Sequence, residues 1–183
     1  MMQKSLRVFI SYSHEDKSLL KELEIHLALL RDQRVITIWY DQDIGAGTEW
    51  KPEIDNHLNE ADIILLLVSP NFMNSYYCYH IEMERAMQRH KAGNARVIPI
   101  ILRYVVWEGA PFSKLQVLPT GGKPIKSWAD PDEAFVNVVQ GIREEVKRQF
   151  MAEAKDLFNN NRKEEALVAL DQVIQFDSED ANA

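Results

Sequence analysis

The sequence has few cysteines and a shortage of basic residues. Cys78 is the single cysteine among 183 residues, so we expect no internal disulfide. The 21 Lys and Arg residues are outnumbered by 28 Asp and Glu, which gives a formal net charge of −7. Proteins that bind nucleic acid by neutralising phosphates need a basic face, so this charge balance argues against a nucleic-acid partner.

Long apolar runs are also absent. The longest, Ile63–Val68, is far shorter than the ~20 residues that span a bilayer. The first residues, MMQKSLRVFIS, lack the apolar core and cleavage site of a signal peptide. We therefore expect a cytoplasmic protein with no membrane anchor. Hydrophobic residues make up 46% and charged residues 27%, which is typical of a soluble globular domain with one main core.

Several kinds of reactive site are missing. The segment SYSHED after the first expected strand has no glycine, so it forms neither a dinucleotide fingerprint nor a phosphate-binding loop. The five histidines and Cys78 show no paired ligand spacing, so we expect no metal site. No G-x-S-x-G motif surrounds Ser69 or Ser75, which argues against a serine hydrolase. Ser69 also stands where a phospho-accepting receiver domain would need an aspartate.

The chain does contain short, β-branched apolar runs that alternate with amphipathic segments. This alternation predicts a doubly wound α/β fold, with helices on both faces of a parallel sheet. We expect helices after Asp16, which is a candidate N-cap, and over Pro52–Asn59, Ser75–His90 and Pro131–Arg148. The expected strands number five: Leu6–Ser11, Val35–Tyr40, Asp62–Ser69, Arg96–Leu102 and a short fifth at Pro124–Ser127.

Four motifs follow one another in these strands and the loops after them. They read RVFISYSHEDK, WYDQDIGAGTEW, DIILLLVSPNF with NSYYCYHIEMERAM, and RVIPIILRYVVWEGAPF. Together they resemble the Toll/interleukin receptor (TIR) domain in its bacterial form, from about Ser5 to Lys147. The resemblance implies a flavodoxin-like, five-stranded parallel sheet, and we place the domain at residues 1–148.

The resemblance implies two alternative functions. Many bacterial TIR domains release nicotinamide from NAD⁺ after self-association in immune or signalling pathways, such as antiviral defence. Animal TIR domains act as catalytically silent scaffolds. The enzymes carry a glutamate four residues after a tryptophan or cysteine, and Cys78 and Glu82 have this spacing. Residues four apart share a helix face, so Cys78 is expected beside the Glu82 carboxylate.

The resemblance therefore implies that Glu82 is catalytic, at the edge of a pocket and partly desolvated. Ser11, Tyr12 and Ser13, at the end of the first expected strand, are candidates to hold the ribose or the diphosphate, with a packed aromatic as the alternative for Tyr12. Ile44, Gly47 and Trp50 are carried over from the family as substrate-contacting, with a helix-start anchor as the alternative for Trp50, and Cys78 is expected at the substrate beside Glu82. NAD⁺ is the substrate and no further cofactor is expected. Gly45 and Gly47 suit a mobile lid over Asp41–Trp50. Tyr77 or Tyr79 is expected to contact the nicotinamide, whereas Trp107 and Trp128 are expected to pack.

The last part of the chain, residues 149–183, has a different pattern. It predicts two short helices around a polar turn at Asn159–Arg162 and resembles one tetratricopeptide repeat (TPR), which implies a protein partner. The segment has three basic residues and eight acidic ones. Its apolar stripe comprises Leu157, Ala166, Leu170, Val173 and Ile174. One repeat cannot bury such a stripe alone, so the TIR domain, further repeats or another subunit is expected to cover it.

Overall fold

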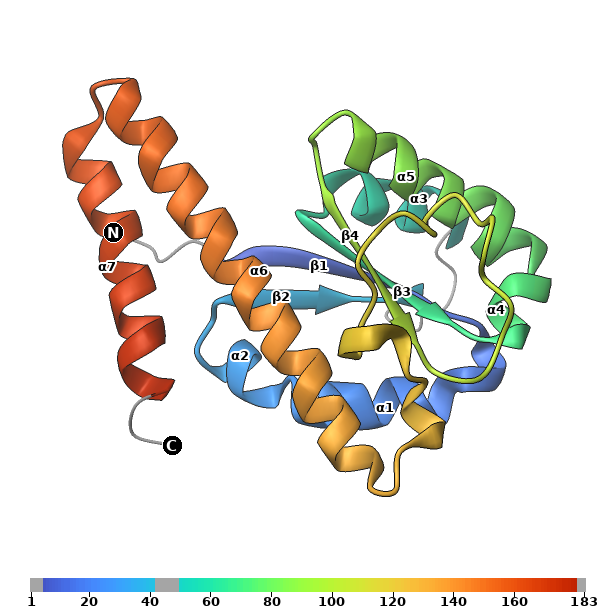
Figure 1. The fold of residues 1–183 in the computed structure, drawn as a ribbon. Coiled ribbons are helices and arrows are strands. Elements are labelled where there is room, and N and C mark those ends of the chain that lie inside the picture. The colour runs from blue at the N-terminus through green and yellow to red at the C-terminus, as the bar shows by residue number, and fades with distance from the viewer. Residues whose placement is uncertain (1–4, 42–49, 181–183) are drawn as a thin grey trace. The chain divides into compact units, whose positions relative to one another are not determined.

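A computed structural model describes residues 5–41 and 50–180 of the chain, which form an α/β fold with a parallel sheet (Figure 1). The four strands of the described sheet lie in the order β2-β1-β3-β4. This order matches the start of the flavodoxin-like order, in which ligands bind at the carboxyl ends of the strands. The strand bounds are Leu6–Ser11 for β1, Ile36–Trp39 for β2, Ile63–Val68 for β3 and Arg96–Ile101 for β4.

The two central strands explain why the sequence predicted a parallel sheet. All six residues of β3 are buried, and its register pairs Val8 with Ile63 on one side and Leu66 with Pro99 on the other. Strands covered on both faces read as continuous apolar runs rather than as alternating ones. The prediction of a parallel α/β sheet is therefore confirmed, and four of the predicted strands lie within two residues of their expected bounds.

Helices cover both faces of this sheet (Figure 1). One core cluster joins Phe9, Ile64 and Val68 of the sheet to Leu58 and Met87 of the overlying helices α3 and α5. On the other face lie α1 and α2 (Figure 1). The helix bounds are Lys17–His26 for α1, Ala28–Asp32 for α2, Trp50–Glu60 for α3, Pro70–Asn74 for α4, Met83–Lys91 for α5, Pro131–Asn159 for α6 and Lys163–Asp180 for α7. Short 3₁₀ turns occupy His14–Asp16, Thr120–Gly122 and Ile125–Ser127, and a π-helical turn occupies Tyr77–Glu82.

The predicted fifth strand at Pro124–Ser127 is wrong. Residues Ile125–Ser127 form a 3₁₀ turn, and the sheet of the described residues has four strands. Next to β4 only an isolated parallel bridge forms, between Ile100 and Leu118. Leu118 makes both backbone hydrogen bonds of this bridge, with Pro99 and Ile101. The Thr120 N–H, which would pair next, donates instead to Asn137 Oδ1 at 2.7 Å, so the ladder does not continue.

Asp16 is the N-cap residue of α1, as predicted, but it does not cap the helix through its side chain. The buried Asp16 carboxylate instead accepts a hydrogen bond from the Ser69 hydroxyl and lies 3.7 Å from Arg103 Nη1. Ser69 caps α4 by accepting a hydrogen bond of 3.0 Å from the Phe72 N–H. This network therefore joins the segments that follow β1, β3 and β4.

The described residues divide into two compact units, residues 5–41 with 50–139 and residues 140–180. Helix α6 is continuous from Pro131 to Asn159, so the helix predicted to end at Arg148 extends eleven residues further. The polar turn predicted at Asn159–Arg162 is present, with Asn161 at a positive φ of 61°. Helix α7 follows, so residues 140–180 form a helical hairpin. None of the described helices is long and apolar enough to cross a membrane.

We predict that Ser69→Ala lowers the free energy of unfolding by about 2 kcal/mol, measured by urea denaturation. The change removes both the cap of α4 and the hydroxyl that hydrogen-bonds the buried Asp16 carboxylate. Ser18→Ala is the matched control, because Ser18 is exposed on α1. The control should change the free energy by no more than about 0.5 kcal/mol. Equal effects of the two substitutions would contradict a structural role for the Ser69–Asp16 network.

Candidate functional site

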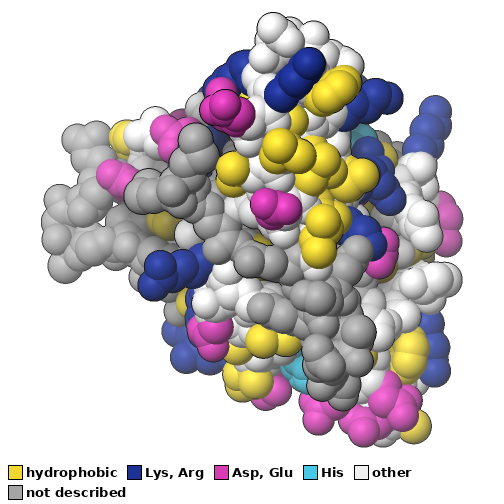
Figure 2. Space-filling view, turned by 90° about the vertical axis from the view of Figure 1, so that its left-hand side faces the viewer, with side chains coloured by type: hydrophobic (Ala, Val, Ile, Leu, Met, Phe, Trp, Pro, Cys, Tyr) yellow, Lys and Arg dark blue, Asp and Glu magenta, His cyan; other side chains and the backbone are white. Residues whose placement is uncertain are grey.

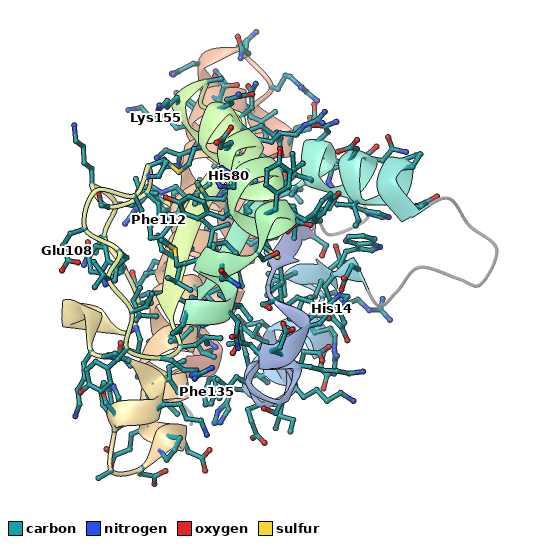
Figure 3. All side chains as sticks on the ribbon, turned by 90° about the vertical axis from the view of Figure 1, so that its right-hand side faces the viewer. His14, His80, Glu108, Phe112, Phe135 and Lys155 are labelled. Atoms are coloured by element: carbon teal, nitrogen blue, oxygen red, sulfur yellow. The ribbon has the colours of Figure 1, made fainter. Side chains whose placement is uncertain are left out.

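A cavity of about 670 Å³ lies at the carboxyl ends of the strands. Its volume is within the usual range for small-molecule sites. Figure 3 views the side of the molecule with His14, from the segment after β1, and His80, from the π-helical turn. The side chains that line the cavity come from the segments after β1, β2 and β3 and from α3: Ile10, Tyr12, Ser13, His14, Glu15, Asp41, Ile54, Asn71, Asn74, Ser75, Tyr77, Cys78 and Glu82.

Glu82 lines this cavity and is only 5% exposed. It is the last residue of the π-helical turn Tyr77–Glu82, a rare conformation that is frequent at functional sites. The hydroxyl of Ser11, the last residue of β1, donates a hydrogen bond to its Oε2. Glu82 is therefore more deeply buried than the pocket-edge position expected from the sequence.

The burial of Glu82 raises the pKa of its carboxyl group to about 8. Desolvation is the main cause, because a buried site disfavours the charged form. The hydrogen bond from Ser11 lowers the pKa, while the nearby carboxylates of Asp41 and Asp55 raise it further. In the ligand-free protein at neutral pH, Glu82 is consequently held mostly as the neutral acid. A bound cation would favour its ionised form.

Cys78 also lines the cavity, one turn before Glu82. Its thiol donates a hydrogen bond of 3.2 Å to the backbone carbonyl of Tyr12. Burial, together with the nearby Glu82 carboxylate, raises the pKa of the thiol to about 12. Cys78 therefore remains a thiol at neutral pH and does not provide a thiolate nucleophile.

The three candidate residues after β1 take different positions. Ser11 is buried and is not among the lining residues, since its hydroxyl is directed to Glu82. Tyr12 and Ser13 both line the cavity. The Tyr12 ring lies edge-on to Tyr40 at 6.1 Å, and the Ser13 hydroxyl donates to Glu15. That hydrogen bond lowers the pKa of Glu15.

Sequence reasoning missed Asp41 as a site residue, although it follows β2 and so lies at the expected edge of the sheet. Its carboxylate interacts with His14, and both residues line the cavity. The other Asp41 oxygen, Oδ1, is buried and has no hydrogen-bond partner among the described residues. Asn71 and Asn74, on α4 after β3, were missed as well. Asp41 follows β2, and Asn71 and Asn74 follow β3, so their position directly after a strand is the sequence signal that could have identified all three as site residues.

The remaining candidates divide between described and undescribed parts of the chain. Ile44 and Gly47 lie outside the described residues, as does the side chain of Trp50, the first residue of α3. Tyr77 lines the cavity and Tyr79 does not. Of the two tryptophans expected to pack, Trp107 is partly buried against the core, and Trp128 donates a hydrogen bond of 3.2 Å to the Lys123 carbonyl.

The charge of the site is predominantly acidic. Glu15, Asp41 and Glu82 line the cavity, whereas no lysine or arginine is among its described lining residues. Within residues 5–41 and 50–180, no group of three or more His, Cys, Asp or Glu side chains could hold a metal ion. The described cavity therefore favours a ligand whose inserted end is neutral or cationic.

We predict that Glu82 makes stability fall as pH rises from about 5 to about 9. Its pKa is about 8 in the folded protein and near 4.5 when unfolded, so folding retains a proton that the unfolded chain releases in this range. Glu82→Gln removes this penalty. Relative to wild type, the variant should gain on the order of 3 kcal/mol in unfolding free energy between these pH values. Urea denaturation of both proteins at pH 5 and pH 9 measures this difference. If the unfolding free energies of wild type and Glu82→Gln changed equally with pH, the raised pKa would be contradicted.

Comparison with known proteins agrees with this geometry. Residues 8–139 match the TIR domain family, and this range ends where the first compact unit ends. The uncharacterized protein y4lF of Sinorhizobium fredii (strain NBRC 101917 / NGR234) is 54% identical over 141 residues, which are 77% of this chain and 44% of that protein. The chain thus spans less than half the length of this relative. The extent of the family match and the parallel sheet together show that the chain belongs to the TIR domain family.

Proposed function

We propose that this TIR domain is an NAD⁺ nucleosidase, which releases nicotinamide from NAD⁺. The observation that carries the proposal is the buried Glu82 carboxyl group in an acidic cavity at the carboxyl ends of the strands. Nicotinamide in NAD⁺ is a pyridinium cation joined to a ribose. Its charge and size suit a cavity of this volume that is lined by carboxylates.

The reaction explains why one carboxylate is sufficient. Ordinary glycosidases use two carboxyl groups, because their leaving oxygen must be protonated. In NAD⁺ the bond between the ribose carbon and the nicotinamide nitrogen breaks, and the electron pair goes to that positively charged nitrogen. Nicotinamide therefore leaves neutral and needs no general acid. A water molecule or another nucleophile then bonds to the ribose carbon, so the product is linear or cyclic.

The charge that develops on the ribose in the transition state is the proposed target of Glu82. An ionised carboxylate stabilises an oxocarbenium-like sugar, and it does so more strongly where water is excluded. Ser11 positions this carboxylate through its hydrogen bond. Tyr12 and Ser13 are proposed to hold the ribose or the diphosphate, and Tyr77 is proposed to contact the nicotinamide ring, because all three line the cavity.

Ionisation of Glu82 is the step that substrate binding is proposed to promote. In the free enzyme at pH 7, the raised pKa keeps the Glu82 carboxyl group mostly in its neutral, protonated form. A nicotinamide cation close to the carboxyl group stabilises its charged form, because an opposite charge within a few ångströms lowers a carboxyl pKa. Glu82 would thus acquire its charge in the complex, where the reaction needs it.

Self-association is the second part of the proposal. The diphosphate of NAD⁺ carries negative charge, and the described cavity lining offers it no lysine or arginine. Tyr12 and Ser13 can hydrogen-bond it, but cationic groups must come from elsewhere. The segment with Ile44, Gly47 and Trp50 has no lysine or arginine, so a second TIR domain is the proposed source. The segment 149–183, whose sequence resembles one TPR, is proposed to bind a protein partner.

We predict that Glu82→Gln lowers the rate of nicotinamide release about 100-fold or more, because the amide cannot supply the charge that stabilises the transition state. The assay uses the full chain fused to a designed oligomer, which supplies clustering. The full chain is needed because a cut at Arg148 falls within α6 and removes the buried Phe150.

Glu84→Gln is the matched control for this assay. Glu84 is exposed on α5, contacts His80 and is not among the cavity-lining residues, so the control should retain wild-type activity. Loss of activity in the control and not in Glu82→Gln would show that the wrong glutamate was chosen. Equal background rates in wild type and Glu82→Gln, with folding and assembly verified, would favour the catalytically silent scaffold.

A second prediction concerns pH. kcat/KM for nicotinamide release should rise about tenfold per pH unit below pH 8 and level off above it, because this ratio reports the pKa of the free enzyme and the reaction needs ionised Glu82. kcat should level off at a lower pH, since the bound nicotinamide cation lowers the same pKa. Initial rates from pH 6 to 9 measure both. A kcat/KM independent of pH over this range would contradict the assignment.

A further inference from the structure

The helical hairpin has an open groove between its two helices. The groove has a volume of about 740 Å³ and is lined by residues of the second half of α6 and the first half of α7. Phe158 and Leu167, on its two walls, are 60% and 61% exposed. In the view of Figure 2, hydrophobic side chains gather in one area, with Lys and Arg as well as Asp and Glu side chains beside them.

The apolar residues of the hairpin form two groups, one buried between the helices and one exposed. Small residues, among them Ala154, Ala166 and Ala169, are buried and allow the two helices to approach closely. Met151, Phe158 and Leu167 remain exposed. Met151 and Phe158 are seven residues apart on α6, which places them on one helix face about 10 Å apart. A groove with such spacing suits the apolar face of a third helix.

The charges around this groove are all positive, although the hairpin is acidic. Arg148, Lys155 and Lys163 line it. The described acidic residues of residues 149–174, by contrast, all lie outside the lining: Glu153, Asp156, Glu164, Glu165 and Asp171. Arg162, the remaining basic residue of the segment, is held by Glu165 at 2.7 Å instead. Three of the six basic residues of the hairpin thus line its apolar groove. Of these, Arg148 is held by Glu145 at 2.7 Å, whereas Lys155 and Lys163 are exposed.

We propose that this groove binds an acidic amphipathic helix of a partner protein. This inference rests on the proposal that the hairpin binds a protein, and it names the chemistry of that protein. Apolar side chains of the partner would contact Phe158 and Leu167, and its carboxylates would face Lys155 and Lys163. Rim charges of this kind give specificity and faster association rather than most of the affinity.

The same charges argue against a second copy of this chain as the occupant. In a two-fold dimer both copies use the same surface, so the lysines of both rims would be brought into one interface. Like charges that meet across an interface are unfavourable. An acidic helix turns the same lysines into attractive partners, and it is the occupant that the charge distribution favours.

The experiment uses the full chain and three labelled helical peptides of about 16 residues. All three carry leucines spaced three and four residues apart, flanked by glutamate, glutamine or lysine. By fluorescence anisotropy, the glutamate peptide should bind about tenfold more tightly than the lysine peptide, and high salt should reduce this difference. Leu167→Asp should weaken binding of the glutamate peptide more than tenfold without changing the helical circular dichroism.

Charge reversal separates the acidic-partner proposal from docking in general. Lys155→Glu with Lys163→Glu should reverse the peptide preference, whereas the control pair Lys17→Glu with Lys21→Glu, exposed on α1, should leave it unchanged. Equal affinity for the three peptides would overturn the acidic partner while leaving a docking groove. Binding of none of them would overturn both. If the free chain forms a dimer and Leu167→Asp abolishes that dimer, the groove binds a second copy of the chain instead. None of these outcomes depends on NAD⁺ cleavage.

Discussion

A carboxyl group removed from water must either be neutral or have a compensating partner, and the candidate site is organised around this constraint at Glu82. The compensation that the fold provides is partial. The Ser11 hydroxyl hydrogen-bonds the carboxyl group, but Asp41 and Asp55 oppose its ionisation. The Glu82 carboxyl group is therefore not mainly an anion in the free protein at neutral pH. We propose that a cationic ligand provides the missing charge at this site, as cleavage of NAD⁺ would require.

A second buried carboxyl group at the same edge of the sheet shows the contrast. Asp16 also receives a hydrogen bond from a serine at the end of a strand, Ser69, but in addition lies 3.7 Å from the Arg103 guanidinium. With a cation supplied by the fold itself, Asp16 joins three segments of the chain and has a structural role. Glu82 has the serine without the arginine. The difference between a structural and a reactive carboxylate therefore lies in which partner the fold supplies.

The sequence predicted those features that depend on local pattern. Continuous apolar runs such as Ile63–Val68 identified the central strands, because a buried parallel strand excludes polar residues from both faces. The fifth strand failed because Ile125–Ser127 form a 3₁₀ turn and the only bridge beside β4 among the described residues, at Leu118, is not extended, since the Thr120 N–H bonds the distant Asn137 side chain. Glu82 was identified by resemblance, but its burial, its π-helical turn and its pKa depend on Ser11, Asp41 and Asp55, which are distant in sequence. Such long-range contacts leave no periodic signal.

The distribution of charge connects the acidic cavity to assembly. NAD⁺ has a cationic ring at one end and a negatively charged diphosphate in its middle, so one surface of a single sign cannot hold both. The described cavity is lined by Glu15, Asp41 and Glu82 and suits the ring, while it repels the diphosphate. If the missing cations come from a second TIR domain, binding of the whole substrate requires that domain to be present. Under this proposal, the charge of the substrate is itself a physical reason for activation by clustering.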